Sequence, residues 1–276
     1  MSNIKNTANN HSRTKIHFTD NELLNPTNPI SVNLIGAGGT GSKVLTALME
    51  MNYSLIELGH AGLQVRLWDD DVITEANLGR QRFAESETGL YKSVALINRV
   101  NRFSGTNWKA ETRKFEKHHS GKIPDDAKAT ITITCVDNVK ARFGVADILE
   151  ELNHRRNYRD LPKYWLDYGN SQHTGQVLLS TIGNIKQPNS EKYETVANLP
   201  FVTEEFGELL KQSETEDDTP SCSLAEALQK QDLFINSSIT QMGCSLLWSL
   251  FRNGMTEYRG FFHNLKEFRT QPMKIA

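Results

Sequence analysis

The chain has 276 residues, of which 23% are charged, and a formal net charge of -2. This near-neutral balance disfavours general nucleic-acid binding through charge, and no apolar run is long enough to span a bilayer. The first residues are polar and lack the apolar core of a signal peptide, so we expect a soluble, cytoplasmic protein.

The N-terminal region comes first in chain order. Residues 1–16 are rich in Asn, Thr and Ser, which predicts a flexible tail, and residues 17–276 are predicted to form a single domain. The segment up to Ile30 contains two prolines and is predicted to be an extended approach to the first strand of that domain.

Residues 31–42, SVNLIGAGGTGS, are predicted to form an apolar strand, a glycine-rich turn and the start of a helix that continues to about residue 52. The glycines of the turn follow G-x-G-x-x-G spacing with one more glycine inside it: Gly36, Gly38, Gly39 and Gly41. Such a turn lets the backbone approach a phosphate, and the helix directs unpaired N–H groups towards it. A tight turn without any ligand has the same spacing. The G-S-K order at 41–43 disfavours a P-loop, which requires G-K-[ST].

The next predicted strand, 63–68, delivers three acids at its carboxyl end: Asp69, Asp70 and Asp71. Ligands bind at such ends in open α/β sheets, beside the glycine turn. Alternation continues with predicted helices over 91–102 and 140–153, and predicted strands over 107–112, 129–135, 164–167 and 176–182. This order predicts an α/β, Rossmann-like, doubly wound and mostly parallel sheet. The link between the last two strands is too short for a crossover helix, so the last strand is predicted to be antiparallel.

Residues 184–220 are polar and acidic, and we expect a solvated crossover insertion that is partly disordered. A capping-box pattern at 223–226 predicts a helix start there. An apolar stripe from Ile235 to Leu250 predicts a helix that ends near Gly254, and 257–265 is predicted to be a closing, antiparallel strand.

Several linked motifs indicate a family. Residues 69–81, DDDVITEANLGRQ, resemble the D-x-D…N-L-x-R-Q signature of the E1-like adenylating superfamily, which includes the ThiF, MoeB and ubiquitin-activating enzymes. Lys92 follows in a G-L-Y-K context, residues 135–138 resemble the family's C-T-D-N strand end, Arg142 follows at the usual offset, and residues 175–177 resemble its G-Q-[IV] strand. The sequence of residues 88–101, TGLYKSVALINRVN, is most similar to ThiF-related proteins of bacterial PRTRC plasmid cassettes.

The resemblance implies ATP and Mg²⁺ as cofactors and a role for each motif residue. The glycine turn would carry the nucleotide, Asp69 would bind the ribose hydroxyls, and Asp137 would hold Mg²⁺. The other nucleotide-binding positions implied are Asp71, Asn77, Arg80, Gln81 and Lys92. Arg80, Lys92 and Asp137 are also the candidate catalytic groups, because charge builds on phosphate and pyrophosphate during adenylation. The two C-x-x-C pairs of MoeB-like members are missing here, so no zinc is expected.

Some of these residues have structural alternatives. Asp70 is interpreted as a solvated neighbour or helper. Arg142 fits a structural ion pair equally well, and the carboxylate of Asp137 fits a loop cap. Two further cysteines, Cys135 in a strand end and Cys244 in an apolar helix, are assigned to packing.

Cys222 is the third cysteine and the candidate catalytic nucleophile. It precedes a predicted helix N-terminus, where the partial positive charge favours the thiolate, and P-S-C-S resembles the P-x-C-T around the thioester cysteine of ubiquitin-activating enzymes. A packed apolar thiol is the alternative.

These observations predict ATP-dependent adenylation of the C-terminal carboxylate of a small ubiquitin-like or sulfur-carrier-like protein that ends in glycine, with thioester transfer to Cys222 as a second step. The family also implies a homodimer. An NAD-dependent dehydrogenase explains the glycine turn and Asp69 but gives the N-L-G-R-Q run no role, and a non-catalytic scaffold leaves the charged motif residues unused. A nucleic-acid substrate is disfavoured by the acidic chain.

Overall fold

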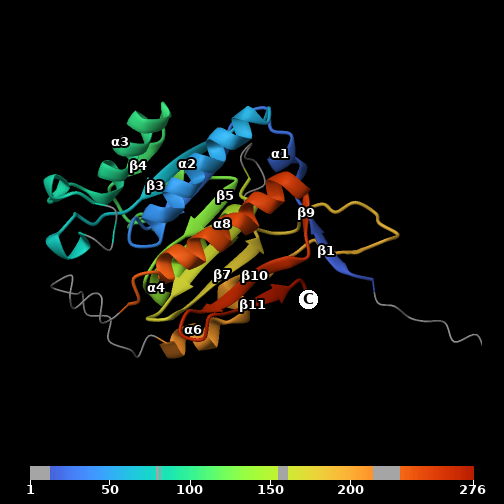
Figure 1. Ribbon diagram of the computed structural model, residues 1–276. Helices are drawn as coiled ribbons and strands as arrows, with labels where there is room; N and C mark the ends of the chain where they lie inside the picture. The colour runs from blue at the N-terminus through green and yellow to red at the C-terminus, as the bar shows by residue number, and fades with distance from the viewer. Residues whose placement is uncertain (1–12, 79–80, 82, 155–160, 214–230) are drawn as a thin grey trace, which may run out of the picture.

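The computed structural model describes residues 13–78, 81, 83–154, 161–213 and 231–276. A sheet of eight strands lies between two layers of helices (Figure 1). Its order across the sheet is β11-β10-β7-β6-β5-β2-β3-β4. The strand bounds, in chain order, are β2 (Ile30–Ile35), β3 (Leu63–Trp68), β4 (Lys109–Glu111), β5 (Ile131–Thr134), β6 (Tyr164–Asn170), β7 (Thr174–Thr181), β10 (Tyr258–Asn264) and β11 (Arg269–Lys274).

The sheet has a parallel half and an antiparallel half. The β2 strand pairs in parallel with both β3 and β5, and β4 and β6 continue the parallel half on either side. The β7, β10 and β11 strands are antiparallel to their neighbours. The doubly wound fold and the reversal at β7 are therefore confirmed, whereas β11 was not predicted and extends the sheet beyond the expected closing strand.

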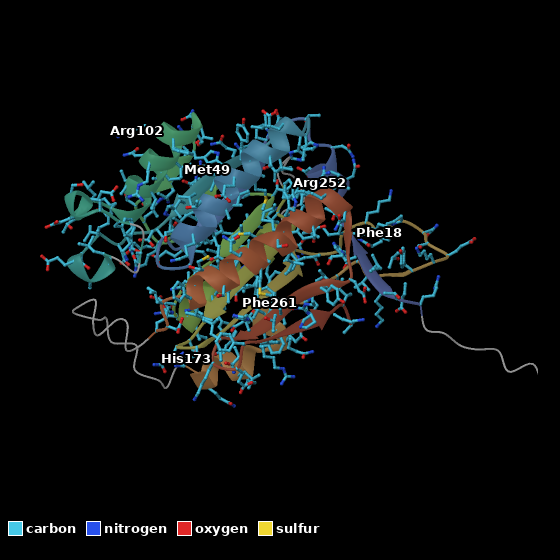
Figure 2. The ribbon with its side chains drawn as sticks, in the orientation of Figure 1. Phe18, Met49, Arg102, His173, Arg252 and Phe261 are labelled. Carbon is cyan, nitrogen blue, oxygen red and sulfur yellow. The ribbon has the colours of Figure 1, made fainter. Side chains whose placement is uncertain are left out.

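Helices cover both faces because strand side chains alternate between two cores. On one face lie α2 (Gly41–Glu57), α3 (Lys92–Ser104) and α8 (Ile235–Asn253), and on the other lie α4 (Val139–His154), α5 (Val202–Glu205) and α6 (Gly207–Ser213). Within β6, Tyr164 and Leu166 belong to the first core and Trp165 to the second. Phe261 of β10 and Met49 of α2 lie on the first side (Figure 2).

The N-terminal segment corrects two predictions. The strand β1 (Lys15–Phe18) begins inside the predicted tail, pairs with β8 (Glu194–Thr195) and β9 (Met255–Thr256), and forms a second, three-stranded sheet. The short helix α1 (Asn21–Leu24) then interrupts the predicted extended approach. Burial explains the order here, since Ile16 and His17 are 5% and 0% exposed. Residues 1–12 lie outside the described part of the chain.

The predicted solvated insertion is wrong for its central part. Phe201, Val202 and Leu210 pack into the second core, and Leu199 packs into the first. The ring of Phe201 meets that of Trp165 edge-on at 5.0 Å. The acidic composition of residues 184–220 as a whole led to the prediction of solvent exposure, although single apolar positions within it are buried. Residues 214–230 and the predicted helix start at 223 lie outside the described residues, and α8 begins at Ile235.

No helix in the described ranges is both long enough and apolar enough to cross a bilayer.

Candidate functional site

The candidate site lies where the sheet changes its winding direction. From β2 the chain runs outward to β3 and β4, and it then returns to the opposite side of β2 for β5 and β6. The turn after β2 and the loop after β5 therefore meet at one edge. A methyl group placed on Gly36 would lie 2.6 Å from the carbonyl oxygen of Cys135. Crevices at such switch points are the usual ligand sites of open α/β sheets.

The glycine turn is held by close backbone contacts. Gly36 has a φ of +94°, a conformation that favours glycine, and a Cβ on Gly41 would lie 1.8 Å from the Gly36 carbonyl oxygen. Gly38 has no atom within 4 Å of its potential Cβ. The first and last glycines are thus required by packing, while Gly38 borders open space.

Asp69 joins the end of β3 to the glycine turn. Its Oδ2 accepts the N–H of Ala37 at 2.6 Å, and its Oδ1 accepts the N–H of Asp71 at 3.0 Å. Burial raises the pKa of Asp69 from its ordinary value of 3.8 to about 6, although both backbone donors and Lys92 act in the opposite direction. The carboxylate is therefore ionised at neutral pH and lies against the turn.

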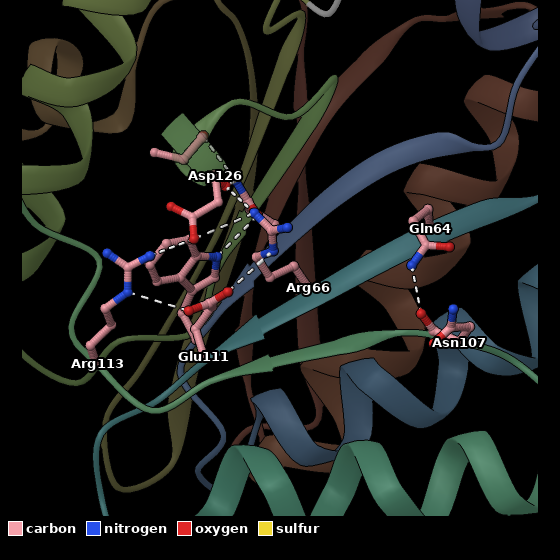
Figure 3. Close-up of polar contacts among 9 residues, drawn as sticks. Gln64, Arg66, Asn107, Glu111, Arg113 and Asp126 are labelled. Carbon is pink, nitrogen blue, oxygen red and sulfur yellow. Dashed lines mark hydrogen bonds and ion pairs between the residues drawn. The ribbon is translucent and has the colours of Figure 1, made fainter. Parts of the chain in front are cut away.

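Four charged side chains support the segment behind Asp69 (Figure 3). Arg66 on β3 and Arg113 after β4 both contact Glu111 and Asp126, with N–O separations of 3.5 Å for Arg66–Glu111 and 3.3 Å for Arg113–Glu111. The Glu111 carbonyl also accepts the backbone N–H of Asp69 at 3.0 Å. The network is neutral in sum, so we assign it a structural role in fixing the end of β3.

Lys92 and Asp71 form an ion pair close to Asp69. The Lys92 Nζ donates to Asp71 Oδ2 at 2.7 Å, and the Lys92 backbone N–H donates to the Asp71 carbonyl at 2.9 Å. The lysine side chain is 8% exposed and the aspartate side chain 66% exposed. The lysine thus begins α3 inside the fold, while its partner faces solvent.

Seven buried side-chain polar atoms have no hydrogen-bond partner among the described residues, and two of them belong to Gln81 (Oε1) and Ser42 (Oγ), the latter in the first turn of α2. Such atoms are rare in native proteins. Gln81 was predicted as a nucleotide contact. Ser42 was not singled out, although its place directly after the last glycine of the turn was a usable signal.

Asn77 is tied into a local cap. Its Oδ1 accepts hydrogen bonds from the N–H and the hydroxyl of Thr74, at 2.9 and 3.2 Å. A phosphate contact would therefore use the amide nitrogen of Asn77. Its backbone carbonyl also receives the N–H of Gln81 at 3.0 Å, so the two predicted phosphate contacts belong to one folded segment.

Asp137 is exposed in the loop after β5. The neighbouring Asn138 caps the first turn of α4, where its Oδ1 accepts the N–H of Ala141 at 2.7 Å. The loop-cap alternative for Asp137 stays a prediction. Asp137 accepts one hydrogen bond from the Asn138 amide, at 3.2 Å. Its carboxylate is available at the edge beside the glycine turn, and a role in metal binding stays a prediction.

Arg142 forms a buried ion pair, the structural alternative noted from the sequence. Its Nε donates to Oδ1 of Asp167 at 2.9 Å, and its Nη2 donates to the carbonyls of Val136 and Tyr168, both at 3.2 Å. The two charged side chains are 5% and 1% exposed. Arg142 therefore connects α4, the end of β6 and the loop that carries Asp137.

The described thiols are packed, as predicted. Burial raises the pKa of Cys135 well above its ordinary value and that of Cys244 to about 11, so neither is a thiolate at neutral pH. Cys244 lies 3.5 Å from the hydroxyl of Tyr168. Cys222 and Arg80, two of the predicted catalytic groups, lie outside the described residues.

The start of α8 also contacts the turn, through a residue that sequence reasoning missed. The Thr40 hydroxyl donates to Oδ1 of Asn236 at 2.7 Å, and a Cβ on Gly39 would lie 2.6 Å from the Asn236 amide nitrogen. The same region is fixed by Asp232, whose N–H donates to the Gln172 carbonyl at 2.8 Å beside His173 (Figure 2). No local motif marks Asn236, because its partner is 196 residues away.

Comparison with known proteins decides the family. A model of the ThiF family matches residues 13–275. The chain belongs to the ThiF family. No curated protein sequence matches it.

Solved structures resemble this ThiF-family chain in fold. E. coli MccB crystallised with selenomethionine MccA aligns with a TM-score of 0.57 and 14% identity, over 92% of this chain and 65% of MccB. PaaA aligns with a TM-score of 0.58 and 12% identity, over 92% of this chain and 75% of PaaA. E. coli MccB with ATP aligns with a TM-score of 0.53 and 16% identity, over 92% and 65%. This chain thus spans about two thirds of the MccB chain, and the identities show the fold alone.

In this ThiF-family chain, the open face of Gly38, the carboxylate of Asp69 and the ammonium group of Lys92 lie at one edge of the sheet. Among the described residues, no group of three or more His, Cys, Asp or Glu is placed to hold a metal. A single carboxylate such as Asp137 still suits Mg²⁺, which commonly combines one or two carboxylates with nucleotide phosphates and water.

Proposed function

We propose that this chain is an ATP-dependent adenylating enzyme whose substrate is the C-terminal carboxylate of a small ubiquitin-like or sulfur-carrier-like protein. The observation that carries the proposal is the contact of Asp69 with the N–H of Ala37 in the glycine turn, beside Lys92. This contact supports a ribose-binding role for Asp69 and a phosphate-binding role for Lys92 at the switch point of a ThiF-family fold. The structural neighbour MccB has been crystallised with ATP and with MccA, which supports ATP as a ligand of this fold.

Each residue has a role in the proposal. Asp69 accepts hydrogen bonds from the ribose hydroxyls. Positive and amide groups surround the phosphates: Asn77, Arg80, Gln81 and Lys92. Asp137 holds Mg²⁺ together with phosphate oxygens, and the metal offsets the charge of the departing pyrophosphate.

The chemistry needs orientation and charge stabilisation. A carboxylate oxygen of the substrate attacks the α-phosphorus, the bond to the bridging oxygen breaks, and pyrophosphate leaves with that electron pair. No general base is needed, because the C-terminal carboxylate is already ionised at neutral pH. Lys92 and Arg80 stabilise the charge that develops on the phosphate oxygens.

Cys222 is the proposed acceptor in a second step. Its thiolate attacks the acyl carbonyl, a thioester forms and AMP leaves. Incubation with ATP, Mg²⁺ and a candidate ubiquitin-like protein, followed by a non-reducing gel, tests this step. We expect a thiol-sensitive adduct that Cys222→Ala abolishes and that Cys135→Ala retains. Pyrophosphate exchange without an adduct would restrict the proposal to adenylation.

Two alternatives have separate tests. A dehydrogenase requires nicotinamide binding, which a titration with NAD measures, and it gives the Lys92–Asp71 pair no function. A scaffold requires that Arg80→Ala leaves the cellular function unchanged. We also propose a homodimer, which light scattering of the purified chain tests directly.

A further inference from the structure

The centre of the glycine turn offers a single side chain for contact with the rest of the fold. Residues 38–41 read G-G-T-G, so Thr40 is the only residue of this stretch that carries a side chain. Glycine loses more conformational freedom on ordering than any other residue. The contact made by Thr40 therefore matters more for the conformation of the turn than one hydrogen bond within a regular helix would.

Thr40 directs its hydroxyl to α8. As the N-cap of α2 it makes no side-chain hydrogen bond to its own helix, although this is the usual role of a threonine at an N-cap. Its hydroxyl donates to Oδ1 of Asn236 at 2.7 Å, and the two residues are only 6% and 2% exposed. The hydroxyl thus ties the glycine turn to a residue that lies 196 positions later in the chain.

Asn236 also packs against the turn. A Cβ on Gly39 would lie 2.6 Å from the Asn236 amide nitrogen, so a side chain at position 39 would displace Asn236. The same nitrogen donates to Oε1 of Gln231 at 3.0 Å. The carboxamide of Asn236 is thus fixed through its oxygen by Thr40 and through its nitrogen by Gln231, and it lies directly against Gly39.

The start of α8 is itself anchored to the antiparallel half of the sheet. The N–H of Asp232 donates to the carbonyl of Gln172, in the turn between β6 and β7, at 2.8 Å. Oδ1 of Asp232 accepts the N–H of Phe234, also at 2.8 Å. Asn236 therefore takes its position from a part of the sheet other than the strand that carries the glycine turn.

We propose that Asn236 is a positioning residue for the nucleotide, because it holds Gly39 and Thr40 in the conformation that presents the turn backbone to the phosphates. This inference rests on the proposed function. Without the contact to Asn236, the glycines of the turn must be ordered again whenever a nucleotide binds. Ordering the backbone of one residue on binding corresponds to a loss of affinity of about tenfold.

The test is a calorimetric titration of the full chain with ATP in excess Mg²⁺. Thr40→Val removes the hydroxyl, and Asn236→Ala removes its acceptor. Thr240→Val is the matched control, because the buried Thr240 hydroxyl donates within α8, to the backbone carbonyl of Asn236, and also at 2.7 Å. We expect Thr40→Val and Asn236→Ala to bind ATP about tenfold more weakly than the wild type, and Thr240→Val to bind it equally well. Thr40→Ser keeps the hydroxyl and should retain most of the affinity.

Urea denaturation of each variant separates stability from affinity. Thr40→Val and Thr240→Val each lose one buried hydrogen bond and should lose comparable stability. The double variant Thr40→Val/Asn236→Ala should bind ATP no more weakly than Asn236→Ala, because both substitutions remove the same contact.

Three results would overturn the inference: equal ATP affinity in Thr40→Val and Thr240→Val, which a purely structural role predicts; losses of affinity that add in the double variant; or a loss in Thr40→Ser as large as that in Thr40→Val. If the folded wild type binds no ATP, the proposed function fails, and this inference fails with it. Wild-type binding that Thr40→Val leaves unchanged refutes the inference alone.

Discussion

Replacement of Asp69 by asparagine tests the electrostatics of the site in a measurable way. Burial raises the pKa of Asp69 from 3.8 to about 6, so the folded chain binds a proton more tightly than the unfolded chain. A raised folded-state pKa gives stability that is present below pH 3.8 and is lost as pH rises through about 6. At about 1.4 kcal/mol per pKa unit, ionisation of Asp69 costs the folded chain about 3 kcal/mol at pH 8.

Asparagine removes that pH-dependent cost and adds a constant one. Its amide oxygen accepts only one of the two N–H groups, from Ala37 or Asp71, and the lost hydrogen bond costs about 1 to 3 kcal/mol at every pH. The difference in free energy of unfolding between Asp69→Asn and the wild type should therefore shift by about 2 to 3 kcal/mol in favour of the variant between pH 4 and pH 8.

Urea denaturation followed by circular dichroism at several pH values measures this difference. Asp70→Asn removes the same charge from the neighbouring, exposed position and serves as the control for the loss of one carboxylate. Parallel curves for Asp69→Asn and the wild type would refute the raised pKa. Nucleotide affinity should fall in Asp69→Asn at all pH values, and in the wild type as pH drops through about 6, because a protonated carboxyl is a poorer ribose acceptor.

Further predictions follow from other contacts. Gly41→Ala places a Cβ against the Gly36 carbonyl, so chemical denaturation should show a free energy of unfolding about 3 kcal/mol or more below that of the wild type. Gly38→Ala should unfold like the wild type but bind ATP more weakly. Equal losses of stability in the two variants would contradict the assignment of Gly41 to packing and Gly38 to open space. Arg142→Met leaves Asp167 buried without its cation and should lower the free energy of unfolding by about 3 to 5 kcal/mol. Adding Asp167→Asn should recover part of that loss. If the losses of the two single variants simply add in the double variant, the two residues are not a coupled pair. Burial lowers the pKa of His17 below 6.5, so its contribution to stability is complete above pH 6.5 and is lost as pH falls further. In His17→Gln the free energy of unfolding should therefore decrease less steeply towards acid pH than in the wild type. An equally steep decrease would show that other groups cause it.

Local features of the site were predictable from the sequence because their causes are local. The turn at 36–41 is dictated by glycines that face neighbouring backbone, and β3 delivers Asp69 beside it by strand geometry. The antiparallel turn between β6 and β7 followed from the length of its link. The parallel direction of the first strands followed from their alternation with helices.

Contacts between distant segments were not predictable. Asn236 reaches Thr40 across 196 residues, and β1 is held through His17, whose Nδ1 donates to the Val196 carbonyl at 2.7 Å. Such pairs leave no periodic or spaced pattern in one sequence. Arg259 gives another example: its Nη2 donates to the Pro200 carbonyl at 2.9 Å and fixes a stretch whose acidic average suggested solvent exposure.

Partner-dependent ATP–pyrophosphate exchange tests the central claim most directly. The assay uses the full chain, ATP, Mg²⁺, labelled pyrophosphate and a candidate ubiquitin-like protein with either a free or an amidated C-terminal glycine. The account predicts exchange with the free carboxylate, none with the amide, and loss of exchange in Lys92→Met. Exchange that is absent with a cognate partner and a folded chain, or that is equal for the free and the amidated partner, would contradict it.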